Sequence, residues 1–229
     1  MRKSIALRPL GLFVLSIFAL AIPAFSQDIP CTATTLLAKQ HRSNMKHRDP
    51  APGAPEAHTV VQALQWSAPA GIQTAAVRKQ DTPYPGRELD GKIYEITGDL
   101  WRVKLESNDC DFHLEISAPG QLKTANRIIV ELRQGPLFLA ARQKLIDELI
   151  ANGYDPAVDK PLDLDEPLRI KVIGLPLYDS AHYSKKNPKR GHGHGTAKVG
   201  TLWELHPFWT SNSSNSPKLA RENPGDPFG

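Results

Sequence analysis

The sequence predicts a mainly β protein in which five strands are joined by turns and one helix lies between the third and fourth strands. Between residues 91 and 209, short segments alternate apolar and polar residues with the period of two that is typical of half-buried strands. Residues that favour turns separate these segments. One longer segment, 136–152, instead has apolar residues at helical spacing.

The first three strands follow one another directly along the chain. Residues 92–97 and 100–106 predict one long strand, which we expect to bend at Gly98. Residues 111–117 (DFHLEIS) alternate three apolar with three charged or polar side chains before the final serine, which indicates one buried face. Residues 127–132 (RIIVEL) form the third strand.

The helix and two further strands complete the predicted domain. Residues 136–152 predict the helix, and Gly153 stands where a helix commonly ends. Residues 168–177 (LRIKVIGLPL) and 201–206 (TLWELH) are the fourth and fifth strands, joined by a long loop. This element order is that of the oligonucleotide/oligosaccharide-binding (OB) fold, a five-stranded Greek-key barrel. We expect the second and fifth strands both to neighbour the first.

The chain begins with the pattern of a secretory signal peptide over residues 1–26. Positive residues precede an apolar run, 10–25, and the small residues Ala24 and Ser26 stand three and one before a predicted cut at Gln27. The alternative is a membrane anchor, but the run is shorter than the roughly 20 apolar residues that span a bilayer. We therefore expect a secreted or periplasmic protein without a membrane span after cleavage.

Three further parts follow the signal peptide. Residues 27–90 are rich in proline and lack a sustained period, which predicts an irregular segment or linker with one short helix at 60–66. Residues 91–209 contain the barrel. Residues 210–229 are Asn, Ser, Pro and Gly with little to bury, which predicts a disordered tail.

Charge and cysteine content narrow the function classes. The chain has 28 Lys and Arg against 24 Asp and Glu, and loss of Arg2, Lys3 and Arg8 with the signal peptide leaves the mature protein nearly neutral. It therefore lacks the positive field of a non-specific nucleic-acid binder. The only two cysteines, Cys31 and Cys110, predict a disulfide in an oxidising compartment. Two free thiols or a metal pair are the alternatives, and no CxxC spacing is present.

Several short motifs resemble those of a family of secreted bacterial proteins of uncharacterised function. They run from about Gly91 to Trp209 and include GDLWRVKLESNDCDFHLEIS, IIVEL, RIKVIGLPLYDSAH and LWELHPFW. The resemblance implies the same barrel and brings no established activity. Phe208 departs from the family's usual aliphatic residue, and the loop after His182 is longer and more basic. The positions that match the family pattern are Asp109, Asp111, His113, Glu131, Asp179, His182, Glu204 and His206.

Two of these motifs suggest a metal site. Asp111 and His113, and likewise Glu204 and His206, are two residues apart on a strand, so each pair projects from one face. His113, His206 and Glu204 are the candidate ligands, and the ion would be Zn²⁺ or Mn²⁺. The alternative is that these side chains bond one another and hold the strands in register.

Four residues are candidates for acid–base catalysis: Asp111, Glu131, Asp179 and His182. Asp179 and His182 are also spaced as in a capped turn, which is the structural alternative. Ser180 between them lacks the flanking glycines of a nucleophile elbow, so the sequence does not predict a serine hydrolase.

The loop after His182 is the strongest candidate for ligand binding. It carries two histidines, in a His-x-His arrangement that can take Cu²⁺ or Zn²⁺, and its cations could hold a phosphate or sulfate. A mobile, solvated loop is the alternative. Trp209 is the candidate for a stacking surface. The cationic candidates are Lys185, Lys186, Lys189 and Arg190.

Two functions follow from these patterns. The first is an exported, non-catalytic binding module for an anionic ligand or an oligosaccharide. The alternative is a metal-dependent hydrolase of phosphodiesters that uses the Asp, His and Glu side chains.

Overall fold

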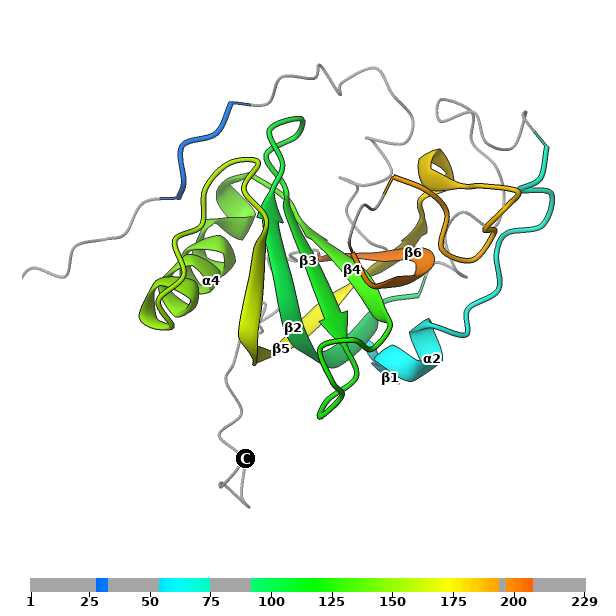
Figure 1. Ribbon diagram of the computed structural model, residues 1–229, viewed down its shortest axis with the longest axis horizontal. Helices are drawn as coiled ribbons and strands as arrows, with labels where there is room; N and C mark the ends of the chain where they lie inside the picture. The colour runs from blue at the N-terminus through cyan, green and yellow to red at the C-terminus, as the bar shows by residue number, and fades with distance from the viewer. Residues whose placement is uncertain (1–27, 33–53, 75–91, 194–196, 208–229) are drawn as a thin grey trace, which may run out of the picture.

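The computed structural model describes residues 28–32, 54–74, 92–193 and 197–207 (Figure 1). The predicted signal peptide, the predicted tail and Trp209 lie outside these residues. Within the described ranges, no helix has the length and apolar character needed to cross a membrane.

The described residues form a β-sheet with two α-helices, one of them short. The strands are β1 (Glu56–Thr59), β2 (Tyr94–Leu105), β3 (Phe112–Ser117), β4 (Arg127–Leu132), β5 (Leu162–Tyr178) and β6 (Val199–Pro207). The helices are α2 (Val60–Ala63) and α4 (Leu139–Ala151), with 3₁₀ turns η2 (Pro136–Phe138) and η3 (Ser180–His182). The prediction of a mainly β protein is confirmed, and α4 lies between β4 and β5, which are the third and fourth of the predicted strands.

The sheet is mixed and nearly closes on itself. Its order is β1-β2-β3-β4-β6-β5, and β5 also pairs with β2, so that five strands form a near-ring. Within this near-ring β4 and β6 are parallel and the other pairs are antiparallel. The expected position of the last strand was wrong: β6 lies between β4 and β5, because β5 occupies the second edge of β2 along its length.

β2 is one long strand, as predicted, but its irregularity is not at Gly98. The pairing with both β3 and β5 shifts between Leu100 and Arg102, which places the bulge at Trp101. The indole of Trp101 is buried and donates to Ser117 Oγ at 2.9 Å. Gly98 serves close packing instead, since a Cβ there would lie 2.8 Å from the Ser117 carbonyl oxygen.

Two strands extend beyond the predicted ones. β1 lies within the segment predicted to be a linker and pairs in parallel with the start of β2, from Glu56↔Tyr94 to Thr59↔Thr97. β5 begins at Leu162 rather than at residue 168, because Leu162 pairs with Val103 beyond the bulge of β2. α2 covers only the first part of the predicted helix and has a capping box in which Thr59 Oγ1 accepts from the backbone N–H of Gln62.

The apolar core lies between the inner faces of the strands and α4, which packs at one side of the sheet (Figure 1). The alternate residues Phe112, Leu114 and Ile116 of β3 are all buried, as the sequence predicted. In α4, Arg142 is fully buried, whereas Ile150 is 55% exposed. The apolar side chains of α4 that face the core are Ala141, Leu145, Ile146 and Leu149.

The predicted disulfide is present in the structure. Cys31 and Cys110 are joined with an S–S distance of 2.08 Å, which ties segment 28–32 to the turn between β2 and β3. The buried guanidinium of Arg142 supports the same junction. Its Nε donates to Asp28 Oδ2 at 2.7 Å, and its Nη1 donates to the carbonyls of Cys110 and Leu132 at 3.0 and 3.1 Å.

Candidate functional site

The polar candidates carried by β3, β4 and β6 lie on the face of the sheet opposite the apolar core. His113 of β3 pairs in register with Glu131 of β4, and Glu204 of β6 pairs with Ile129 of β4. Because side chains alternate between the two faces of a strand, Glu131, Glu204 and His206 share the outer face with His113. In the sheet, β4 separates β3 from β6.

The two predicted His–carboxylate motifs form separate pairs. His113 Nδ1 lies 3.0 Å from Glu131 Oε1, and His206 Nε2 lies 3.3 Å from Glu204 Oε2. All four side chains are largely buried, and Glu131 and His206 are each 5% exposed. Among the described residues, the predicted set of His113, His206 and Glu204 is therefore divided between two contacts and is not gathered around one point.

The environment of His113 favours its charged form. Burial opposes the imidazolium and lowers the pKa, but the hydrogen bond and the charge of Glu131, with further help from Glu115 and Glu106, outweigh it. The pKa of His113 is therefore raised above its usual value of 6.5.

A second group of carboxylates meets Glu131 from the turn between β2 and β3. One oxygen from each of Asp109, Asp111 and Glu131 lies within 4.8 Å of the others. Three carboxylates suit a hard cation such as Mg²⁺, Ca²⁺ or Mn²⁺ better than Zn²⁺. Two of these carboxylates also accept backbone hydrogen bonds: Asp109 Oδ1 accepts from the N–H of Asp111, and Asp111 Oδ1 accepts from the N–H of Gln134.

Another carboxylate on the outer face, that of Glu115, forms ion pairs with two arginines. Glu115 is 1% exposed and lies between Arg127 Nη1 at 3.2 Å and Arg102 Nε at 3.4 Å. A buried carboxylate with two cationic partners and a backbone donor at Lys198 is a structural ion-pair network.

In the loop between β5 and β6, His182 has Asp179 and His192 as neighbours. Asp179 caps η3, with its Oδ1 accepting from the N–H of Ala181 at 3.0 Å. Its other oxygen lies 3.5 Å from His182 Nε2. The rings of His182 and His192 lie 5.8 Å apart between centroids.

The four predicted cationic residues of this loop have different surroundings. Lys185 and Lys186 are exposed on the loop. Arg190 donates to the side-chain oxygen of Asn126, in the connection between β3 and β4. Lys189 lines a cleft.

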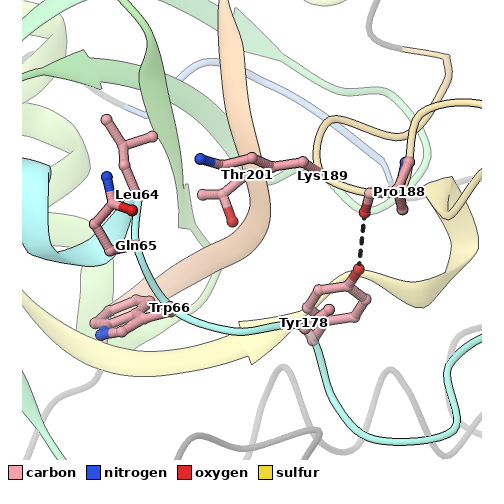
Figure 2. Close-up of a pocket in the computed structure, with 8 residues that line it drawn as sticks. Leu64, Gln65, Trp66, Tyr178, Pro188, Lys189 and Thr201 are labelled. Carbon is pink, nitrogen blue, oxygen red and sulfur yellow. Dashed lines mark hydrogen bonds between the residues drawn. The ribbon is translucent and has the colours of Figure 1, made fainter.

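This cleft lies between the segment after α2, the start of β6 and the loop (Figure 2). Its volume is about 270 Å³, and its walls are mainly apolar. Figure 2 shows the rings of Trp66 and Tyr178 on one side, with the Tyr178 hydroxyl donating to the Pro188 carbonyl at 3.4 Å. The remaining lining residues are Leu64, Gln65, Ala68, Lys189 and Thr201.

The two rings of the cleft belong to a chain of aromatic contacts. Trp203 makes edge contacts with both Trp66 and Tyr178, at centroid distances of 6.0 and 5.2 Å. Trp66 also stacks on His58 and donates its indole N–H to His58 Nε2 at 3.2 Å. Trp203 itself is 1% exposed, so it supports the two rings of the cleft from behind.

Trp66 and Tyr178 were not among the residues predicted from the sequence. Each nevertheless carries a local signal: Trp66 directly precedes the Ser-Ala-Pro that breaks the short helix, and Tyr178 ends a strand at the start of the long loop. An aromatic residue at the end of an element, next to a loop, is well placed to line a cleft.

Comparison of the chain with protein-family models, with curated proteins and with solved structures finds no match.

Proposed function

We propose that this chain is an exported binding module, built on an OB-type barrel, that holds one ring of an acidic oligosaccharide in the cleft of Trp66, Tyr178 and Lys189. The observation that carries the proposal is the cleft itself. It joins two aromatic rings to a cation and a hydroxyl, from Thr201, in one small cavity.

The strand arrangement supports the barrel. Five strands form a near-ring in the order β2-β3-β4-β6-β5, and α4 lies between the third and fourth of them in sequence, which agrees with the strand number and the helix position of an OB fold. In such folds the loop between the fourth and fifth strands contributes to ligand binding. Here that loop supplies Pro188 and Lys189 to the cleft.

The chemistry of the walls supports the ligand class. A volume of about 270 Å³ is just below the roughly 300–1,000 Å³ of pockets for drug-sized ligands, so it suits a single ring. The apolar face of a sugar packs on an aromatic ring, while Lys189 can pair with a carboxylate on the same sugar. The nearly neutral mature chain makes a polyanionic nucleic acid a poorer partner.

Export is supported by two independent features. The sequence begins with a signal-peptide pattern, and Cys31 and Cys110 form the disulfide expected outside the cytoplasm. Mass spectrometry of the secreted or periplasmic protein should give a chain that begins at Gln27.

The proposal is tested by titrating the untagged mature chain with a galacturonic-acid trimer, a neutral glucose trimer and a ten-nucleotide oligothymidine. We expect saturable binding of the acidic trimer, followed by tryptophan fluorescence and calorimetry. Trp66→Ala should weaken it about tenfold or more, since stacking on an aromatic ring contributes about 1–3 kcal/mol.

Lys189→Ala has a matched control. It should weaken the acidic trimer severalfold, whereas Lys186→Ala, an exposed lysine of the same loop outside the cleft lining, should leave binding unchanged. Equal effects of the two substitutions, or a Trp66→Ala protein that binds like the wild type, would contradict the proposal. Tight oligothymidine binding that falls steeply with salt would replace it with a nucleic-acid function.

A metal-dependent hydrolase is the second candidate, favoured by the grouping of Asp109, Asp111 and Glu131 beside His113. A cation held there would supply an activated water molecule. The binding function is preferred because Asp111 is 1% and Glu131 5% exposed, which leaves a polymeric substrate little access. Hydrolysis of bis(4-nitrophenyl) phosphate that needs Mn²⁺ and is lost in Asp111→Asn, but not in the surface variant Asp163→Asn, would reverse that preference.

A further inference from the structure

The loop between β5 and β6 contains a histidine around which the backbone is closely fitted. His192 donates its N–H to the carbonyl of His182 at 2.8 Å, and the ring Nδ1 of His182 lies 2.6 Å from the carbonyl of His192. Gly191 and Gly193 both have positive φ, at 68° and 84°. A Cβ on Gly191 would lie 2.1 Å from the His182 carbonyl oxygen, and a Cβ on Gly193 would lie 2.8 Å from His182 Nδ1. Only glycine at both positions lets the chain wrap around this ring.

This wrapping fixes the tautomer of His182. A carbonyl oxygen can only accept, so the proton of this hydrogen bond is on Nδ1. In the neutral ring, Nε2 is then an acceptor, and it faces Asp179 Oδ2 at 3.5 Å. Two acceptors at this distance attract one another only through a positive charge between them, which a proton or a metal ion supplies.

The surroundings of the pair are those of metal ligands. A ligating histidine typically donates its second ring N–H to a carbonyl, and a ligating carboxylate is itself held by a hydrogen bond. His182 has the first feature, and Asp179 has the second, because its Oδ1 accepts from Ala181. Two ligands about 2.0–2.2 Å from a tetrahedral zinc stand about 3.3–3.6 Å apart, which includes the separation of Nε2 and Oδ2.

A third ligand is close. The ring of the exposed His192 lies 5.8 Å from that of His182 between centroids. The three ligand atoms do not form a closed set as they stand, since the described residues give only Asp109, Asp111 and Glu131 within 4.8 Å. Rotation of the His192 side chain, on a segment with glycine at both sides, would bring its ring towards the other two.

We propose that Asp179, His182 and His192 form a zinc-binding site at the root of this loop, with water completing the tetrahedral coordination. None of these three residues lines the cleft or belongs to the carboxylate group at Asp109. Histidine and carboxylate ligands with one open position suit Zn²⁺ among the divalent metals.

Calorimetry with ZnCl₂ alone, on the mature chain purified without a histidine tag, tests the proposal. We expect one equivalent of Zn²⁺ and, in the Co²⁺-loaded protein, the intense visible bands of tetrahedral coordination. His192→Ala, which leaves the backbone hydrogen bonds in place, and Asp179→Asn should each weaken Zn²⁺ at least about tenfold. Asp163→Asn, the same substitution at an exposed position of β5, is the matched control for Asp179→Asn and should bind like the wild type.

Other results would overturn the site. A wild-type protein that binds no Zn²⁺, or variants that bind as tightly as the wild type, would leave Asp179 and His182 as structural supports of the loop. Binding that is lost in His194→Ala but kept in Asp179→Asn and His182→Gln would assign the metal to the His-x-His segment alone. Thermal unfolding of each variant without metal separates loss of ligands from loss of folding.

Discussion

The α4 side of the sheet and the side that carries the β5–β6 loop are held by different interactions (Figure 1). At the first, a disulfide and the fully buried guanidinium of Arg142 fix segment 28–32 against α4 and the β2–β3 turn. At the second, ring contacts and backbone hydrogen bonds hold the segment after α2 and the loop around the cleft. Covalent and buried charged contacts leave little freedom, whereas rings and exposed loops can adjust to a ligand. We therefore expect changes at the first side to alter stability and changes at the second to alter binding.

Replacement of Arg142 should have the largest effect. Arg142→Ala removes the donors to Asp28 and to two carbonyls and leaves a cavity, so we expect a loss of about 3–5 kcal/mol in the free energy of unfolding, measured with urea. Lys144→Ala, an exposed position of the same helix, should change it by less than about 0.5 kcal/mol. A loss below about 1 kcal/mol for Arg142→Ala would mean that the two sides of the sheet do not differ in this way.

Removal of the disulfide should come next. The bridge closes a separation of 79 residues, and Cys31→Ser with Cys110→Ser should cost about 2–4 kcal/mol of unfolding free energy, largely through the unfolded state. Binding to the cleft of the folded protein should not change, because the bridge lies away from it. Weakened binding of the acidic trimer by the folded double variant would show that the two sides are coupled.

Gly191 gives a smaller, local effect. Gly191→Ala puts a Cβ against the His182 carbonyl at a φ of 68°, and we expect about 1–3 kcal/mol of strain. The loop can open without unfolding of the sheet. We therefore expect Gly191→Ala to accelerate limited proteolysis within residues 183–193 while the free energy of global unfolding falls little. Gly120→Ala is the control: its φ is 73°, but nothing lies within 4 Å of the added Cβ, so it should show only the dihedral cost. Equal effects would remove the argument that the loop is fitted around His182.

The pH dependence of stability gives the smallest effect. The pKa of His113 is raised in the folded state, so its pair with Glu131 contributes fully below the unfolded value of 6.5 and is lost as pH rises through the folded value. Melting temperatures of the wild type and of His113→Gln should therefore differ more at pH 5.5 than at pH 9. A difference that grows with pH would show that the imidazole is neutral in the folded protein.

The elements that depend on local pattern were predictable from the sequence. The alternation in residues 111–117 placed β3 and its buried face, residues 127–132 gave β4 with the bounds that the structure has, and two isolated cysteines gave the disulfide. β1 was not predictable in the same way, because three of the four residues of Glu56–Thr59 are exposed and carry no apolar alternation. Its strand conformation comes from pairing with β2.

The candidate site was less predictable from the sequence, because it depends on contacts between segments that are far apart in the chain. Spacing places Asp111 with His113, and Glu204 with His206, each on one face of a strand. Only the strand order shows that β4 lies between these two strands. An arginine in an isolated helix is expected to face solvent. Arg142 is buried because its guanidinium donates to carbonyls from two other segments. Trp66 enters the cleft through contacts with residues more than a hundred positions away, such as Trp203.

The parallel pairing of β1 has a consequence for self-association. β3 pairs with β2 only from Asp99 onward, and β1 covers the remaining stretch, Tyr94 to Thr97. Without β1, that stretch would offer a row of N–H and C=O groups to any passing strand, and an uncovered edge of this kind invites joining of one copy to the next. β1 places a four-residue edge strand over this stretch, three of whose residues are exposed, and very short polar edge strands are less prone to join a second copy.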